Sequence, residues 1–176
     1  MATTKWSLDP THSELEFKVK HLMITTVTGK LNEFTSELVS EGDDFNHAKV
    51  SFEAKLSSVD TGNTDRDNHL KSPDFFDADQ FPLLTFDSGV LSEDGDDYAL
   101  KGNLTIKGIT KPVQLTVEFG GIATDPWGNT KAGFTLSGKI KRTDFGLNWN
   151  AALETGGVMV SEEVRILGEL QFVKQA

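Results

Sequence analysis

Apolar side chains recur at every second position along most of this chain, and that period constrains the fold more than any other feature of the sequence. It is the period of a β-strand with one buried face, because successive side chains of a strand point to opposite sides of the sheet. The segments that carry it are 14–20, 50–56, 98–106, 113–119, 134–140 and 164–172, with weaker candidates at 27–39 and 83–88. No segment of useful length has a helical period, so the sequence predicts an all-β antiparallel domain of about eight strands.

Turn-forming clusters separate these segments, as in SEDGDD at 92–97 and TDPWGN at 124–129, and residues 108–112 are expected to connect the two strands of a hairpin. Between Leu31 and Phe34 the period slips, as a β-bulge would make it. The strand period fits either a barrel or a sandwich. Many strands are long, however, and long unpaired edges favour aggregation, so closure into a barrel is favoured. Because the composition shows no repeat or linker, residues 1–176 are expected to form a single domain.

Composition excludes several classes of function. The chain has 17 basic and 27 acidic residues, a net charge of −10, and its basic residues are spread along the sequence, which argues against a nucleic-acid surface. Cysteine is absent, which excludes disulfides, thiol catalysis and thiolate metal sites. No apolar stretch approaches the ~20 residues of a membrane span. The start lacks a basic segment followed by an apolar one, so the expected compartment is the cytoplasm, or the periplasm if a leader has been removed.

One polar stretch, DRDNHLKSPDFFDADQFPLLTF at 65–86, interrupts the strand pattern. Residues that cap helices precede it and acidic residues occupy its start, so TDRDNHLKS is expected to form a short helix that ends at Pro73. The aromatic pair Phe75 and Phe76 follows. Two interpretations stay open: the pair closes the core while Arg66 pairs with a nearby carboxylate, or the element gates a cavity.

Four stretches resemble successive motifs of the YceI-like family. They are WSLDPTHSELEFKVKHL at 6–22, SVDTGNTDRDNHLKSPDFFDADQFPLLTFDS at 58–88, LKGNLTIKGITKPVQLTVEF at 100–119 and RTDFGLNWN at 142–150. The match covers nearly the whole chain in order. This resemblance implies an extended, lipocalin-like, eight-stranded antiparallel barrel with a short helical insertion around residues 65–80. It further implies that an apolar lumen binds a long-chain amphiphile, typically a polyisoprenoid or a fatty-acid-like molecule, and it implies no conserved reaction. We expect a ligand of polyisoprenoid or isoprenoid-quinone type, and no cofactor.

Inward parity and the resemblance together give a set of candidate ligand-binding residues. They are Phe17, Val19, His21, Arg66, His69, Phe75, Phe76, Phe86, Leu104, Leu115, Val117, Phe134 and Trp149. His21 is either a core histidine with a hydrogen-bond partner or a polar anchor for a ligand head group. Trp149 suits a lumen wall or a plug at one end. Arg66 and Arg142 fall at element ends, where they would bind an anionic head group or form surface ion pairs.

Neither a metal centre nor a catalytic site is predicted. His12, His21 and His69 form no HxH or HxxxH pair, and the sequence has neither GxSxG nor GxxxxGK. His12 is expected to make a structural hydrogen bond, and His47 to lie solvated in a turn. Of the other two tryptophans, Trp6 is expected to pack at one end of the fold and Trp127 to lie in a loop. Alternation places three cations outside the barrel: Lys139, Lys141 and Arg165.

The favoured function is non-enzymatic binding and sequestration or transport of one long-chain lipid in the lumen. Burial of ~20 methylene groups at ~0.8 kcal/mol each would nominally give ~16 kcal/mol, near the limit of non-covalent affinity. Fatty-acid or fatty-amide binding in the same lumen is one alternative, and an interaction module with a filled lumen is another. A third is an enzyme acting on a lipid with His21 or His69 as base. The expected partner is an isoprenoid or acyl lipid and not nucleic acid, and a homodimer is left open.

Overall fold

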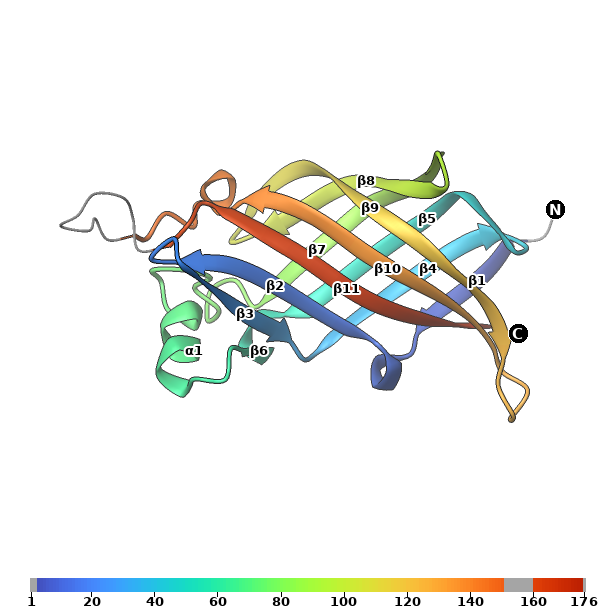
Figure 1. Cartoon of the computed structure of the whole chain (residues 1–176), viewed down its shortest axis with the longest axis horizontal. Helices are drawn as coiled ribbons and strands as arrows, with labels where there is room; N and C mark the ends of the chain where they lie inside the picture. The colour runs from blue at the N-terminus through green and yellow to red at the C-terminus, as the bar shows by residue number, and fades with distance from the viewer. Residues whose placement is uncertain (1–2, 151–159, 176) are drawn as a thin grey trace.

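The computed structural model describes residues 3–150 and 160–175, which form an antiparallel β-barrel (Figure 1). The strands are β1 (Thr3–Leu8), β2 (Glu14–His21), β3 (Thr25–Leu31), β4 (Phe34–Glu41), β5 (Asp44–Lys55), β6 (Val59–Asp60), β7 (Leu83–Asp94), β8 (Asp97–Ile106), β9 (Ile109–Thr124), β10 (Thr130–Lys141) and β11 (Glu163–Lys174). The helical elements are α1 (Thr64–Lys71) and three 3₁₀ turns, η1 (Pro10–His12), η2 (Leu56–Ser58) and η3 (Arg142–Phe145).

Eight strand positions close into a ring within the described residues. Strands β4, β5, β7, β8, β9, β10 and β11 pair in that order, and β1 closes the ring by pairing with both β4 and β11. Strand β2 continues the position of β1 beyond η1, because it pairs with the preceding part of β11. Strands β3 and β4 share a position in the same way, separated by Asn32 and Glu33. The predicted eight-stranded antiparallel barrel is confirmed, and the predicted slip between Leu31 and Phe34 is a complete break in the strand.

Two local predictions are wrong. The β8–β9 connection is only Lys107 and Gly108, and pairing extends through the predicted loop to Pro112, which lies opposite Asn103. Both turn residues have left-handed φ angles, 53° and 75°, which is the backbone of the two-residue turn that matches strand twist, and Gly108 adopts it without a steric penalty. His47 is exposed as expected but lies within β5, where φ is 68° and the pairing with β4 is irregular.

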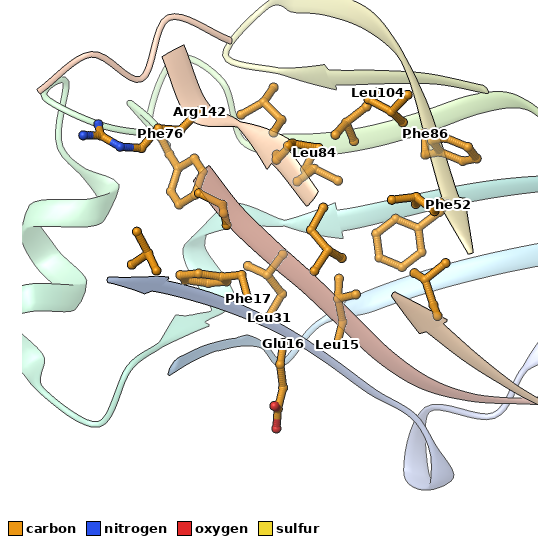
Figure 2. Close-up of a pocket in the computed structure, with 18 of the residues that line it drawn as sticks. Leu15, Glu16, Phe17, Leu31, Phe52, Phe76, Leu84, Phe86, Leu104 and Arg142 are labelled. Atoms are coloured by element: carbon orange, nitrogen blue, oxygen red, sulfur yellow. The ribbon is translucent and has the colours of Figure 1, made fainter. Parts of the chain in front are cut away.

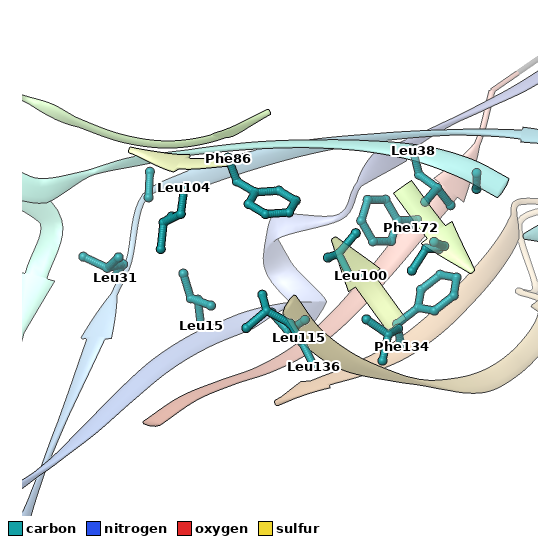
Figure 3. Close-up of a cluster of buried hydrophobic side chains, with 14 of the residues drawn as sticks. Leu15, Leu31, Leu38, Phe86, Leu100, Leu104, Leu115, Phe134, Leu136 and Phe172 are labelled. Atoms are coloured by element: carbon teal, nitrogen blue, oxygen red, sulfur yellow. The ribbon is translucent and has the colours of Figure 1, made fainter. Parts of the chain in front are cut away.

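Aromatic side chains fill one end of the lumen. The ring centroids of Trp6 and Phe45 lie 5.3 Å apart, those of Phe45 and Phe134 5.1 Å, and those of Phe134 and Phe172 5.8 Å. Trp6 is fully buried and donates its Nε1–H to Ser40 Oγ at 2.8 Å, which satisfies the polar atom of the indole. Figure 3 shows Phe134 and Phe172 grouped at one end of the buried cluster. This aromatic plug closes that end of the barrel.

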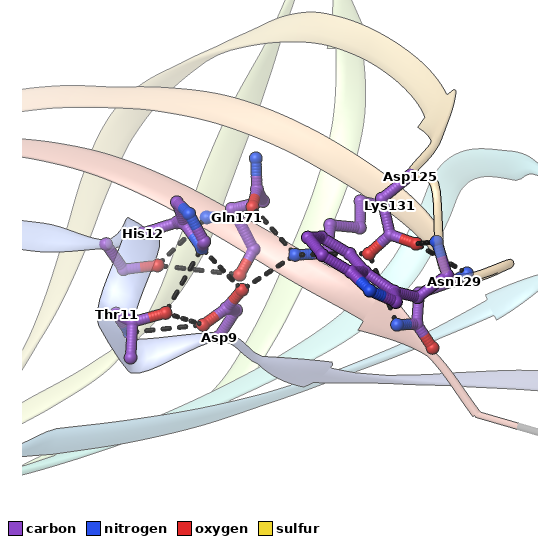
Figure 4. Close-up of polar contacts among 9 residues, drawn as sticks. Asp9, Thr11, His12, Asp125, Asn129, Lys131 and Gln171 are labelled. Carbon is purple, nitrogen blue, oxygen red and sulfur yellow. Dashed lines mark hydrogen bonds and ion pairs between the residues drawn. The ribbon is translucent and has the colours of Figure 1, made fainter.

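A polar network holds η1 against β10 (Figure 4). Asp9 accepts hydrogen bonds from Thr11 N–H at 3.1 Å and Thr11 Oγ1 at 2.7 Å, and it lies 2.8 Å from His12 Nδ1 and 2.9 Å from Lys131 Nζ. Burial by itself would raise the pKa of Asp9, but these bonds to the ionised carboxylate outweigh it and hold the pKa far below its ordinary value. His12 therefore makes the structural contact that the sequence predicted.

The polar interruption forms the predicted helix. Asn63 is the N-cap of α1 and its side chain accepts from Arg66 N–H at 3.0 Å. Asp67 accepts from the backbone N–H and the hydroxyl of Thr61, at 2.8 and 2.6 Å, which holds the helix to the residue that follows β6. The helix ends at Lys71, and its C-cap Ser72 immediately precedes Pro73. Figure 1 shows α1 at the same end of the barrel as the β2–β3 turn.

Candidate ligand cavity

Between the aromatic plug and α1 the lumen contains a cavity of about 530 Å³. Its wall is built mainly from the inward positions of the barrel strands, as expected from the period of two. Figure 2 shows apolar side chains from opposite walls facing this space, whereas the carboxylate of Glu16 points away between inward-facing Leu15 and Phe17. All thirteen predicted ligand-binding residues line this one cavity. Their contact with a ligand stays a prediction.

Glycines on neighbouring strands accommodate the large wall residues. Gly29 lies opposite Phe17 in the β2–β3 ladder, and a Cβ built on Gly29 would collide with the Phe17 ring. A Cβ on Gly138 of β10 would likewise collide with the side chain of Leu115 on β9. Each of these two wall side chains occupies the space beside a glycine that a Cβ would take. The cavity beyond them shows that the described side chains leave part of the lumen unfilled, contrary to the filled-core alternative.

Three rings pack together at the mouth of the cavity. The centroid of His69 on α1 lies 5.0 Å from that of Phe75 and 4.8 Å from that of Trp149, and Phe75 lies 5.3 Å from Trp149. The Nε2 atom of His69 is 3.0 Å from Asp74 Oδ2, which fixes the ring orientation. Phe75 is buried, with 8% of its surface exposed. The aromatic pair thus belongs to the mouth and not to the plugged end, while its role as a gate stays a prediction.

Arg66 lies at the cavity mouth but does not form the predicted ion pair. Its Nε and Nη2 atoms donate to the hydroxyl and the carbonyl of Thr61, each at 2.7 Å. In the part of the chain that the structure describes, no carboxylate pairs with this guanidinium. Thr61 is itself fixed by Asp67, so a neutral acceptor pair holds the arginine beside the cavity.

Arg142 is not the free donor that the sequence suggested. It is buried, with 4% exposed, and its Nε and Nη2 atoms donate to the carbonyls of Ser161 at 2.8 Å and Val160 at 3.2 Å. Its Nη1 atom donates to the carbonyls of Leu147 at 2.6 Å and Trp149 at 2.8 Å. Burial lowers the pKa of this guanidinium from its ordinary value, although arginine stays charged. Arg142 therefore links, through its hydrogen bonds, the two segments that contain Trp149 and Val160.

His21 is half-buried and lines the cavity close to its mouth. Its side chain makes no hydrogen bond with any described residue, and both interpretations of this histidine, as a core residue and as a ligand anchor, stay predictions. His12 precedes the other end of β2, about 25 Å away at ~3.3 Å per strand residue, so the two cannot share a metal ion. Within residues 3–150 and 160–175, no cluster of His and carboxylate side chains has the arrangement of a metal site, and no helix is long and apolar enough to cross a membrane.

Residues 6–172 match the YceI-like domain family. The chain belongs to this family. A UPF0312 protein of Staphylococcus aureus is 39% identical over 170 residues, covering 96% of this chain and 97% of the relative. Among solved structures, the YCEI protein of Campylobacter jejuni has a TM-score of 0.74 at 31% identity, with 89% and 90% of the two chains covered.

Two other solved structures share the fold at lower sequence identity. BcnA of Burkholderia cenocepacia has a TM-score of 0.80 at 23% identity, covering 93% of this chain and 98% of its own. A domain of Saccharophagus degradans, described as a polyisoprenoid binding domain, has a TM-score of 0.68 at 18% identity, covering 97% and 98%. At these identities the likeness extends to the fold alone.

Sequence reasoning missed part of the wall of this YceI-like barrel. Val27 and Leu31 on β3, and Leu84 on β7, line the cavity but lie in segments whose period was weak. Phe52 on β5 had clear inward parity, and that signal would have found it. Leu70 of α1 had no such signal, because its place on the wall depends on how the helix docks.

Proposed function

We propose that this YceI-like protein binds one long-chain amphiphile non-covalently in its barrel lumen and carries it shielded from water. The observation that supports this proposal is the cavity of about 530 Å³, apolar along its wall and closed by aromatic packing at one end. Apolar ligands bind in cavities of this size, which lies within the ~300–1,000 Å³ range of ligand pockets. The described wall is mostly apolar, so burial of a chain is the chemistry that the cavity supports best.

The cavity volume sets the length of chain that fits. If a methylene-sized group takes about the ~30 Å³ of a water molecule in the liquid, the cavity of about 530 Å³ holds ~18 such groups. At ~0.8 kcal/mol each, their burial would supply ~14 kcal/mol before the cost of ordering the ligand. Three or four isoprene units, or one ordinary acyl chain, therefore fill the lumen. A longer polyisoprenoid would extend out through the mouth.

An isoprenoid is the favoured cargo, because a relative of the same fold is described as a polyisoprenoid binding domain. A fatty acid or fatty amide is the second candidate, since the cavity would accept its chain equally well. The polar side chains Arg66, His21 and His69 border the cavity near its mouth, where the head group of either ligand would lie. Chain chemistry is discriminated weakly by an apolar wall, so length and head group should dominate selectivity.

Thermal stability of lipid-extracted protein tests the proposal. A ligand that binds only the native state adds RT ln(1 + [L]/Kd) to the free energy of unfolding, so the melting temperature should rise with bound isoprenol or fatty acid. The rise should grow with chain length and level off near ~18 carbons, where the cavity is full. Absence of any shift across both series of chain lengths would refute the carrier proposal.

A further inference from the structure

The turn between β2 and β3 has an unusual sequence for its backbone. Ile24 N–H donates to the carbonyl of His21 at 3.2 Å, and the two residues between them, Leu22 and Met23, have left-handed φ angles of 52° and 60°. This is the geometry of a type I′ turn, in which Asn-Gly is strongly preferred and apolar side chains are strained. Burial does not compensate, because 54% of Met23 and 76% of Ile24 is exposed. We call residues 22–24 the apolar tip.

A group of basic residues lies on the outer face of the strands beside the apolar tip. In the β10–β11–β2 ladder Lys139 lies directly opposite Arg165, which lies directly opposite Lys18. Like charges at directly opposed positions destabilise a sheet, so folding does not account for this row. Lys20 and Lys141 continue the two outer strands towards the same end. We call these five cations the basic patch.

The basic patch contrasts with the rest of the chain. The carboxylates within two residues of it in sequence are those of Glu16 and Glu163, and Glu163 lies 3.6 Å from Lys139 Nζ and opposite Lys141 in the β10–β11 ladder. Outside the patch and these two carboxylates, the chain has 12 basic and 25 acidic residues. The patch is therefore a local group of positive charges on a chain whose net charge is −10.

The apolar tip, the basic patch and the cavity mouth are contiguous. Lys20 and His21 border the cavity, and the tip follows His21 directly. Lys18 lies about 13 Å from Leu22 at ~3.3 Å per strand residue. Figure 1 shows the β2–β3 turn at the α1 end of the barrel, opposite the β9–β10 turn.

We propose that the apolar tip and the basic patch form a docking surface for a lipid bilayer that contains anionic head groups. The tip inserts Met23 and Ile24 at the level of the head groups, and the patch binds the lipid phosphates, which together are the two signals of reversible membrane attachment. Because the tip and the patch lie beside the mouth, docking through them brings the mouth close to the membrane. Delivery of a lipid through that mouth rests on the proposed function, whereas docking itself does not.

Flotation of the full chain with vesicles tests this proposal, since it measures docking without any bound cargo. Vesicles of phosphatidylcholine containing about one-third phosphatidylglycerol should carry the protein, and phosphatidylcholine alone should carry much less. Replacement of Leu22→Asn with Met23→Gly gives the turn its preferred sequence, so this variant should unfold at higher denaturant while its vesicle partitioning falls about tenfold or more. Loss of binding in a more stable variant cannot be attributed to misfolding.

Two matched controls test whether binding depends on this surface or only on net charge and exposed aromatic residues elsewhere. The double variant Arg165→Gln, Lys18→Gln should bind vesicles at least tenfold more weakly and with a flatter salt dependence. The double variant Lys49→Gln, Lys101→Gln removes equal charge from β5 and β8 and should bind like the wild type. Trp127→Ser removes an exposed aromatic at the opposite end, where 83% of Trp127 is exposed, and should leave binding intact.

Four results would overturn the proposal. They are no flotation of the wild-type chain, equal loss in the control variants, no loss in the turn variant, and a wild-type dimer in vesicle-free solution that the turn variant abolishes. Failure of flotation together with a ligand-induced rise in melting temperature would reject docking while leaving the carrier proposal standing.

Discussion

Replacement of Val113 by Trp should fill part of the lumen from within. Val113 on β9 is half-buried, lies on the cavity wall and pairs with Gly102 of β8. The indole adds about seven non-hydrogen atoms, which is more than a third of the ~18 groups that about 530 Å³ can hold. Loss of burial for ~6 methylenes at ~0.8 kcal/mol each weakens binding by ~5 kcal/mol, which is more than a thousandfold in Kd.

Calorimetric titration of lipid-extracted protein with a chain of about 18 carbons should measure that loss. The free energy of unfolding should change by no more than the ~1–3 kcal/mol of an overpacked core, because the new ring enters existing space. Gln114→Trp is the matched control, since the next residue on β9 is exposed and points away from the lumen. Equal ligand affinity in the two variants would refute the lumen as the binding site.

Three further changes test other parts of the account. Phe17→Asp should lower the free energy of unfolding by several kcal/mol, because it places a charge on the lumen side of β2. Lys18→Glu, on the outer face, should change that free energy by less than ~0.5 kcal/mol. Equal denaturant midpoints for the two variants would contradict the strand parity. If Phe75 and Phe76 form a gate, the double variant Phe75→Ala, Phe76→Ala should speed ligand dissociation more than it lowers the free energy of unfolding. A large drop in the denaturant midpoint with an unchanged dissociation rate would refute the gate hypothesis. Asp9→Asn should destabilise the protein by ~1–3 kcal/mol at neutral pH. A carboxylate with a lowered pKa stabilises the fold above its unfolded-state pKa, so the difference from wild type should shrink as pH falls below about 4, and a constant difference would be contrary evidence.

The parts of the fold that local physics determines could be predicted from the sequence. Inward parity of Phe17 and Val19 follows from the period of a strand, which holds whatever the partner strands are. The helix α1 was predicted because its cap, its acidic first turn and Pro73 all lie within one short segment. These two local signals were enough to identify residues that the fold brings to a single cavity.

Predictions failed where distant backbone decides the outcome. Arg142 resembled a free donor in the sequence, but its partners include carbonyls about twenty residues later, which only the folded chain brings together. Arg66 resembled half of an ion pair, but Thr61 presents two nearer acceptors once Asp67 fixes it. The apolar tip escaped notice because Leu22 and Met23 carry none of the usual signs of a type I′ turn.

Native mass spectrometry of the freshly purified chain, followed by organic extraction, tests the central claim most directly. The account predicts a second species heavier by one long-chain lipid, its loss on extraction, and its return at 1:1 stoichiometry when an isoprenoid of about 15–20 carbons is added back. A single species with the mass of the bare chain, both before extraction and after addition of isoprenoid and acyl lipids, would contradict the claim that this barrel carries a lipid.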